Sequence, residues 1–250
     1  MATYTDRNLY RVACDSPDLT SFRVSIKETD MMIMADGDFH TEAYNSVLKC
    51  RLVLEDFLKK EPEWGLSLEP VEVESTAPPL VKVMSDAALA AGVGPMAAVA
   101  GAIAESVGEE LGRNSESVII ENGGDIFMKS SKGRIIGIYA GRGLAEIGLG
   151  LRIDPEDTPL GICTSSGLIG PSLSRGTARV ATVLARSAPL ADAVATALGN
   201  RLKSSGEVKQ ALAWAGSIEG VSGALALHGK TFGAFGGLNL IKLDTGGKKR

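Results

Sequence analysis

The chain has 250 residues, enough for a complete hydrophobic core, and we expect a single domain over residues 1–250. Apolar residues make up 44% and charged residues 22%, a composition that excludes intrinsically disordered and fibrous proteins. The formal net charge is −4, aromatic residues are only 5%, and the basic residues are dispersed apart from a short basic tail at 244–250. This composition indicates no surface that follows a phosphate backbone or stacks bases, so nucleic acid is not expected as a partner.

The beginning of the chain carries Asp6 and Arg7 and has no apolar signal segment, so a cytoplasmic location is expected. The cysteines are odd in number and lack the spacing of a zinc site or a disulfide framework: Cys14, Cys50 and Cys163. Residues 87–104 carry no charge and reach the lower length limit of a membrane helix. They are rich in alanine and interrupted by glycine and proline, so the segment predicts two helices meeting at 92–95, and no membrane contact is expected.

The first half predicts a strand pair followed by helices. Strands are expected at 22–26 and 31–35, separated by a polar turn. Apolar positions recur at helical spacing over 41–60, and Pro62 predicts the end of that helix. Two further helices are predicted at 80–91 and 95–111.

The second half returns to strands, and together the halves predict an α+β fold with antiparallel sheets. Hairpin-type turns predict a meander of three strands near 117–120, 126–129 and 134–139. The remaining predicted elements are strands at 146–153 and 177–185, a helix at 189–202, and closing strands at 224–228, 231–235 and 238–243.

A weak internal repeat indicates a duplication. Residues 95–103 align with 189–198, and the only gap falls at Asp192. Alanine-rich helices match one another easily by chance, but both copies occupy equivalent places in the order of elements. We therefore expect two related halves, at about 20–112 and 115–243.

Asp192 and Thr196 are four residues apart in a predicted helix, so both side chains lie on one helix face. A carboxylate and a hydroxyl are hard oxygen donors that suit Mg²⁺ or Ca²⁺. A structural role is the simpler interpretation from spacing alone, because Asp in a first turn complements the helix dipole and Thr can bond to a carbonyl one turn earlier.

Two glycine-containing segments supply groups for a bound ligand. Glu121 to Asp125 follows a strong predicted strand, and its glycines would let a ligand approach the backbone closely, although a type I′ hairpin turn has the same pattern. Thr164, Ser165, Ser166 and Gly167 offer hydroxyl and amide groups for a phosphate, or form a polar loop.

Nucleophilic catalysis is not favoured by the candidate side chains. Cys163, Ser165 and Ser166 lack the GxSxG context of a nucleophile elbow. Only His40 and His228 could serve as imidazole bases, and their positions in a helix start and an alternating strand indicate structural or solvated side chains.

Three segments resemble, in their order, the motifs NxGGD, TSG and AD-x3-TA of the ApbE flavin transferases. They are Asn122 to Asp125, Thr164 to Gly167 and Ala191 to Ala197. The segment from Gly92 to Gly101 is also similar to the ApbE-like branch called UPF0280. The resemblance covers roughly residues 20 to 243 and implies the T-fold, with duplicated β2α2β2 halves.

The resemblance implies a protein that binds FAD, uses Mg²⁺, and transfers FMN to a protein threonine or hydrolyses FAD. It implies Asp192 and Thr196 as metal ligands, together with a backbone carbonyl near Ala97 or Ala98. It further implies flavin-binding roles for Asn122, Gly123, Gly124, Asp125, Thr164, Ser165, Ser166 and Gly167.

The chain also departs from the family pattern. The segment from Gly92 to Gly101 lacks the Asp and Lys of the family's DxGGxAKG entrance, and the family's HIxDPxTG stretch has no counterpart after Thr164. Three hypotheses therefore stay open: a Mg²⁺-dependent FMN transferase or FAD hydrolase, a protein that binds a flavin-like or pterin-like ligand without turnover, and a structural component of a homo-oligomer.

Overall fold

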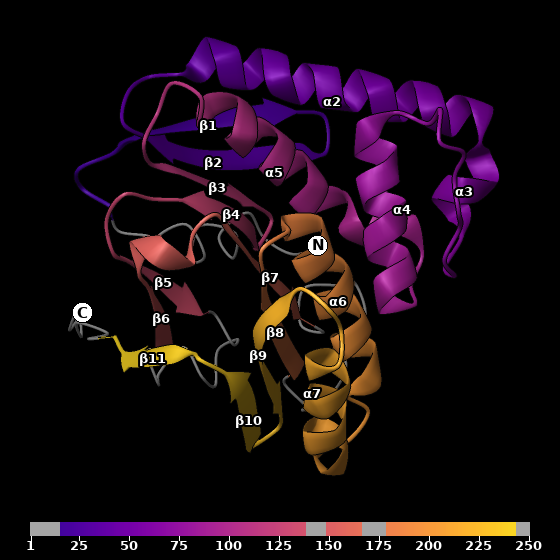
Figure 1. The fold of residues 1–250 in the computed structure, drawn as a ribbon, viewed down its shortest axis with the longest axis vertical. Coiled ribbons are helices and arrows are strands. Elements are labelled where there is room, and N and C mark those ends of the chain that lie inside the picture. The colour runs from indigo at the N-terminus through magenta and orange to yellow at the C-terminus, as the bar shows by residue number, and fades with distance from the viewer. Residues whose placement is uncertain (1–15, 139–148, 167–178, 244–250) are drawn as a thin grey trace, which may run out of the picture.

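A computed structural model describes residues 16–138, 149–166 and 179–243 (Figure 1). Its centre is an antiparallel sheet of eight strands in the order β1-β2-β3-β4-β7-β8-β9-β10. These strands are β1 (Thr20–Ile26), β2 (Thr29–Ala35), β3 (Val118–Asn122), β4 (Asp125–Lys129), β7 (Leu160–Ser166), β8 (Arg179–Ala185), β9 (Val221–His228) and β10 (Thr231–Gly236). A second sheet, in the order β11-β6-β5, contains β5 (Arg134–Ile138), β6 (Leu149–Ile153) and β11 (Asn239–Lys242).

The α-helices are α2 (His40–Lys60), α3 (Pro62–Leu66), α4 (Pro79–Ala91), α5 (Val99–Leu111), α6 (Ala188–Arg201) and α7 (Val208–Gly216). Single turns of 3-10 helix are η1 (Pro95–Ala98), η2 (Pro155–Asp157) and η3 (Ser205–Glu207). The helices cover one face of the eight-stranded sheet, and the three-stranded sheet lies on the other side (Figure 1).

Alternation along the strands divides the core between these layers. Ile120 packs with helix residues, whereas its neighbour Ile119 packs in the cluster under the second sheet. Neighbouring strand residues point to opposite faces, so a residue of β3, β4 or β7 faces either the helices or the second sheet. This division decides which candidate residues can meet.

The expected elements of the first half are confirmed. The strand pair forms the hairpin β1–β2, the long amphipathic segment forms α2, and the alanine-rich stretch forms α4 and then η1 with α5. The helix α4 ends at Gly92, whose φ of 69° is the left-handed conformation that glycine tolerates. Within the described residues no single helix has the length and hydropathy to cross a membrane; α4 and residues 95–111 pass that test only as a pair bent by 105°.

The predicted three-stranded meander is wrong for its last strand. β3 and β4 form the expected hairpin, but β5 pairs with β6 in the second sheet. The free edge of β4 is taken by β7, more than 30 residues further along the chain. Turn propensity depends only on local sequence, so it could not predict that the distant strand β7 pairs with β4 in place of β5. The helix α7 was also not predicted.

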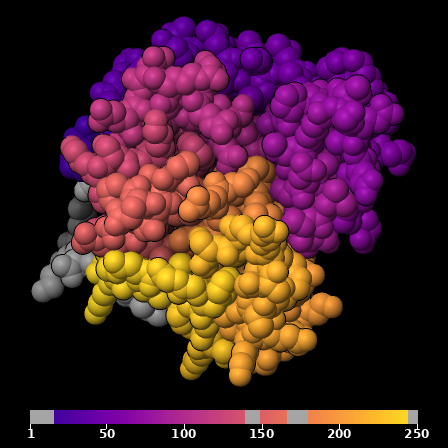
Figure 2. All heavy atoms as spheres, viewed as in Figure 1, coloured from indigo at the N-terminus to yellow at the C-terminus, as the bar shows by residue number. Residues whose placement is uncertain are grey.

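Residues 20–129 contribute β1 to β4 to one half of the large sheet, and residues 160–236 contribute β7 to β10 to the other half. The boundary expected at 112–115 lies between α5 and β3, inside the first of these two sets. The helices α2 to α5 are inserted between β2 and β3, and α6 and α7 between β8 and β9. In Figure 2 residues 40–110 cover the top and right of the visible face, and the second half covers the bottom. That the halves are duplicates stays a prediction.

Candidate functional site

The turn between β3 and β4 brings the first group of candidate residues to the edge of the helix layer. Gly123 and Gly124 form a two-residue hairpin loop with φ values of 71° and 109°, which explains the need for glycine at both positions. Asn122 and Asp125 face each other across this loop. The Glu121 carboxylate closes the turn by accepting a 2.9 Å hydrogen bond from the Gly124 amide.

Asn122, Asp125 and Cys163 lie on the helix-facing side of the sheet. Asp125 is directly opposite Cys163 in the pairing of β4 with β7. The Cys163 thiol lies 3.5 Å from the carbonyl oxygen of Ala188 in α6, and the Asn122 amide nitrogen donates a 3.0 Å hydrogen bond to the carbonyl of Ala100 in α5. The turn, β7 and the two central helices therefore meet at one place.

Asp192 lies at the same meeting point and caps a helix other than its own. Its Oδ2 atom accepts a 2.9 Å hydrogen bond from the backbone amide of Gly101, in the first turn of α5. Asp192 lies beyond the first turn of α6, so the interpretation that it complements the dipole of its own helix is wrong. It complements the positive end of α5 instead.

The opposite connection runs from Glu105 of α5 to the first residue of α6. The Glu105 Oε2 atom accepts a 2.5 Å hydrogen bond from the backbone amide of Ala188. The two central helices therefore exchange carboxylate caps. Glu105 was not predicted as a site residue, because no local pattern distinguishes it from an exposed helix glutamate.

The site concentrates acidic groups in a buried environment. Burial raises the pKa of Asp125 to about 7, and the nearby Glu121 carboxylate acts in the same direction. Burial and the Asp125 carboxylate raise the pKa of Asp192 well above its usual range, against two backbone hydrogen bonds from Gly101 and Ala100. Burial, followed by these two carboxylates, raises the pKa of the Cys163 thiol. The arrangement favours a bound cation or retained protons.

The candidate metal ligands come from adjacent elements. Asp192 and Thr196 are one turn apart on α6, and η1, which contains Ala97, packs against α6. Within the described residues no group of three or more His, Cys, Asp and Glu side chains is arranged to hold a metal ion. A cation here would thus depend on few side chains, as Mg²⁺ sites commonly do.

The second candidate segment is divided between the two faces of the sheet. Ser165 lies against Gly199 of α6, on the helix side. Thr164 is on the opposite face, where its hydroxyl lies 2.9 Å from that of Thr182. Because neighbouring strand residues point to opposite faces, Thr164 cannot join Ser165 on the side of the sheet where Asp192 lies. Ser166 ends β7, and Gly167 lies outside the described residues.

The two histidines lie outside this cluster. The ring of His40 packs against Phe22 at the start of α2, and His228 is buried at the end of β9. In the described part of the chain neither bonds to a candidate residue. The structural interpretation of both histidines is consistent with these positions.

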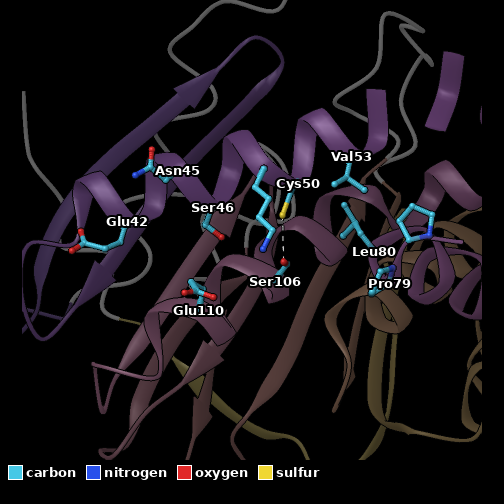
Figure 3. Close-up of a pocket in the computed structure, with 11 residues that line it drawn as sticks. Glu42, Asn45, Ser46, Cys50, Val53, Pro79, Leu80, Ser106 and Glu110 are labelled. Atoms are coloured by element: carbon cyan, nitrogen blue, oxygen red, sulfur yellow. Dashed lines mark hydrogen bonds between the residues drawn. The ribbon is translucent and has the colours of Figure 1, made fainter. Parts of the chain in front are cut away.

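Several surface hollows formed by the described residues lie away from Asp192. One of about 520 Å³ lies between α2, α5 and the start of α4, where Cys50 lies 3.3 Å from Ser106 (Figure 3). A second of about 690 Å³ is lined by α3 and the segment after it. A third of about 500 Å³ lies beside β6 and η2.

A family model and similar known proteins agree on the family of this chain. A family model described as "AbpE bacteria" matches residues 12–219. UPF0280 proteins of Methanocella arvoryzae and Methanocaldococcus jannaschii are 38% and 39% identical, over 88% and 89% of this chain and 89% and 93% of their own lengths.

Solved structures show the same fold at low identity. The apo form of the flavinyl transferase ApbE of Pseudomonas stutzeri is similar with a TM-score of 0.57 and 13% identity, over 89% of this chain and 94% of its own. The flavin transferase ApbE of Vibrio cholerae has a TM-score of 0.50 and 13% identity, over 89% and 97%. At such identity the likeness shows the fold alone.

Proposed function

The chain belongs to the UPF0280 branch of the ApbE-like proteins, and we propose that it binds a flavin nucleotide. In the presence of Mg²⁺ it would hydrolyse FAD at the pyrophosphate or transfer the FMN part of FAD to a protein threonine. The flavin part of the proposal is supported by the flavin transferases that share the fold. The magnesium part is supported by the chemistry of the site.

One observation carries the proposal: Asp192 and Asp125 place two carboxyl groups in one region, where burial raises the pKa of both and the Asp125 carboxylate raises that of Asp192 further. Buried carboxylates without a compensating charge are costly, and a divalent cation removes that cost. A carboxylate has about four lone-pair positions, so the amide hydrogen bonds to Asp192 leave acceptor capacity for a cation.

The donor set fits Mg²⁺. We assign the Asp192 carboxylate, the Thr196 hydroxyl and the Ala97 carbonyl as its protein ligands, all of them hard oxygen donors. When bound, Mg²⁺ would neutralise negative charge on the pyrophosphate oxygens. The rest of its coordination would be left to water and phosphate.

The chain's own residues would position the nucleotide. The loop from Asn122 to Asp125 offers a close backbone approach at Gly123 and Gly124, where nothing within 4 Å crowds Gly123. The Ser165 hydroxyl would contact the phosphates from the helix side of β7, and Ser166 and Gly167 would add backbone amides. The Thr164 hydroxyl faces the other side of the sheet, so only its backbone could take part. Asn122 is held by Ala100 and thereby keeps the loop against α5.

The order of elements also supports a T-fold with duplicated halves. Residues 20–129 and residues 160–236 each give two strands, a helical insertion and two strands to the large sheet. Pro95 and Pro189, the first residues of the sequence repeat, each lie at the start of a helical segment that reaches the site.

A flavin fluorescence time course tests the activity, because FAD brightens when its adenine is removed. FAD is incubated with the protein and either Mg²⁺ or EDTA. We expect a rise that requires Mg²⁺ and is lost in Asp192→Asn, which removes the charge but keeps an oxygen to accept the Gly101 amide. Asp86→Asn, an exposed carboxyl of α4, is the matched control and should keep full activity.

Equal rates with Mg²⁺ and EDTA, or full activity of Asp192→Asn, would contradict the magnesium site. Binding without turnover is the second candidate function, favoured by a helix entrance at Gly92 to Gly101 that carries no Asp or Lys. A flat trace with saturable FAD binding, measured by fluorescence quenching, would establish it. Absence of FAD binding would exclude both the enzymatic function and binding without turnover.

A further inference from the structure

The chain between α3 and α4 lines a hollow that the flavin proposal does not use. This hollow, of about 690 Å³, lies between the end of α2, α3 and the segment 71–78. Its wall includes Phe57 and Val73, and its rim includes Glu61, Glu63, Glu72 and Glu74. The hollow therefore has an apolar wall and a negatively charged rim.

The lining of this hollow carries only negative charge, although Lys59 and Lys60 adjoin it in the last turn of α2. Residues 61–81 contain five glutamates and no lysine, arginine or histidine. The glutamates are exposed, and none of them forms an ion pair with any other described residue. Two leucines beside them, Leu66 and Leu68, are 75% and 86% exposed. A ligand complementary to this surface is cationic and carries apolar side chains.

The backbone of the same segment is open to pairing. Within the described chain the N–H and C=O groups of Val71, Glu72 and Val73 have no hydrogen-bond partner. Val71 and Val73 are partly buried against the helix core, whereas Glu72 and Glu74 are exposed. This alternation is that of a β-strand, and an extended segment with free backbone groups can accept an added strand.

We propose that residues 70–74 form a docking edge for an extended, basic segment of a partner protein. The partner segment adds as a strand to Val71–Val73, its lysine or arginine side chains face the glutamates, and its apolar side chains contact Leu66 and the hollow. Charged side chains on an edge can instead serve to prevent pairing, and the experiment below separates the two roles.

The probe is a fluorescein-labelled peptide of alternating lysine and valine, six residues long, titrated with the full chain and followed by fluorescence anisotropy. We expect saturable binding that weakens with salt. The double variant Glu72→Lys/Glu74→Lys should weaken binding at least about tenfold, because two attractive charges become repulsive. Its matched control, Glu116→Lys/Glu219→Lys, makes the same charge change at exposed sites elsewhere and should bind as the parent does.

A second peptide tests the backbone contact without changing the protein. In this peptide alternate backbone nitrogens are methylated, which removes donors and keeps the charge. We expect its binding to be lost. Equal binding of both peptides, equal weakening by both double variants, or no saturable binding of the parent would each overturn the proposal. Thermal unfolding of every variant verifies that the comparison is between folded proteins.

Discussion

The Asp192 carboxylate of α6 and the Gly101 amide of α5 are joined by a hydrogen bond of 2.9 Å, and this contact depends on the absence of a side chain at Gly101. A Cβ atom there would lie 2.4 Å from the carbonyl oxygen of Ala188 and 3.0 Å from the Cβ of Asp192. Backbone atoms cannot move aside without separating the two central helices. The close approach of α5 and α6 is therefore built into the sequence at one residue.

Gly101→Ala is expected to destabilise the protein. Alanine gains about 1 kcal/mol in helix propensity over glycine, but overpacking against backbone costs typically about 1–3 kcal/mol and prevails at such short distances. Urea unfolding should show a net loss. Gly237→Ala, where nothing lies within 4 Å, should change stability by less than about 0.5 kcal/mol. Equal effects of the two substitutions would show that α5 and α6 separate easily.

Asn122→Asp should be more destabilising than Asn122→Ala. Asn122 is 8% exposed and donates a 3.0 Å hydrogen bond to the Ala100 carbonyl. Alanine removes the donor, at a cost of about 1–3 kcal/mol for the carbonyl left unpaired. Aspartate also places a negative charge against that carbonyl and beside Asp125. The difference, measured by urea unfolding at pH 7.5, should shrink at pH 5, where the new carboxyl is more readily protonated; a constant difference would contradict the electrostatic explanation.

Local sequence signals predicted the elements well where they depend on neighbours in the chain. The apolar periodicity of residues 41–60 gave α2 almost to the residue, and Gly92 marked the end of α4. Strand pairing was harder to predict from the sequence, because β4 pairs with the distant strand β7 and not with β5. The position of Asp192 was predicted as a site residue, but its bond to Gly101 joins residues 91 positions apart. No periodicity encodes such a contact.

Glu105 should make the protein less stable as the pH rises. Burial raises its pKa from 4.5 to about 7 in the folded protein, so between these values the folded state holds a proton that the unfolded state has released. Its contribution therefore favours folding below pH 4.5 and is lost as the pH rises through 7. Glu105→Gln keeps an oxygen for the Ala188 amide and removes the titration.

The measurement is the free energy of unfolding at several pH values between 5 and 7.5. The variant should lose less stability than the parent over this range, by more than about 1 kcal/mol. Asp125 titrates in the same range but is present in both proteins, so the difference isolates Glu105. Glu69→Gln, at an exposed position, should follow the parent. A Glu105→Gln profile parallel to the parent would show that Glu105 is not buried in solution.

Cys163 should resist alkylation while the protein is folded. Its side chain is fully buried, and burial with the carboxylates of Asp125 and Asp192 raises its pKa, so little reactive thiolate forms. Cys50 is 6% exposed and lines the hollow in Figure 3, although burial also raises its pKa. In a Cys14→Ser background, N-ethylmaleimide followed by peptide mass spectrometry should label Cys50 first. Cys163 should react only at the rate of unfolding and become reactive in urea. Labelling of Cys163 as fast as Cys50 would mean that the junction of β7 and α6 opens in the native state.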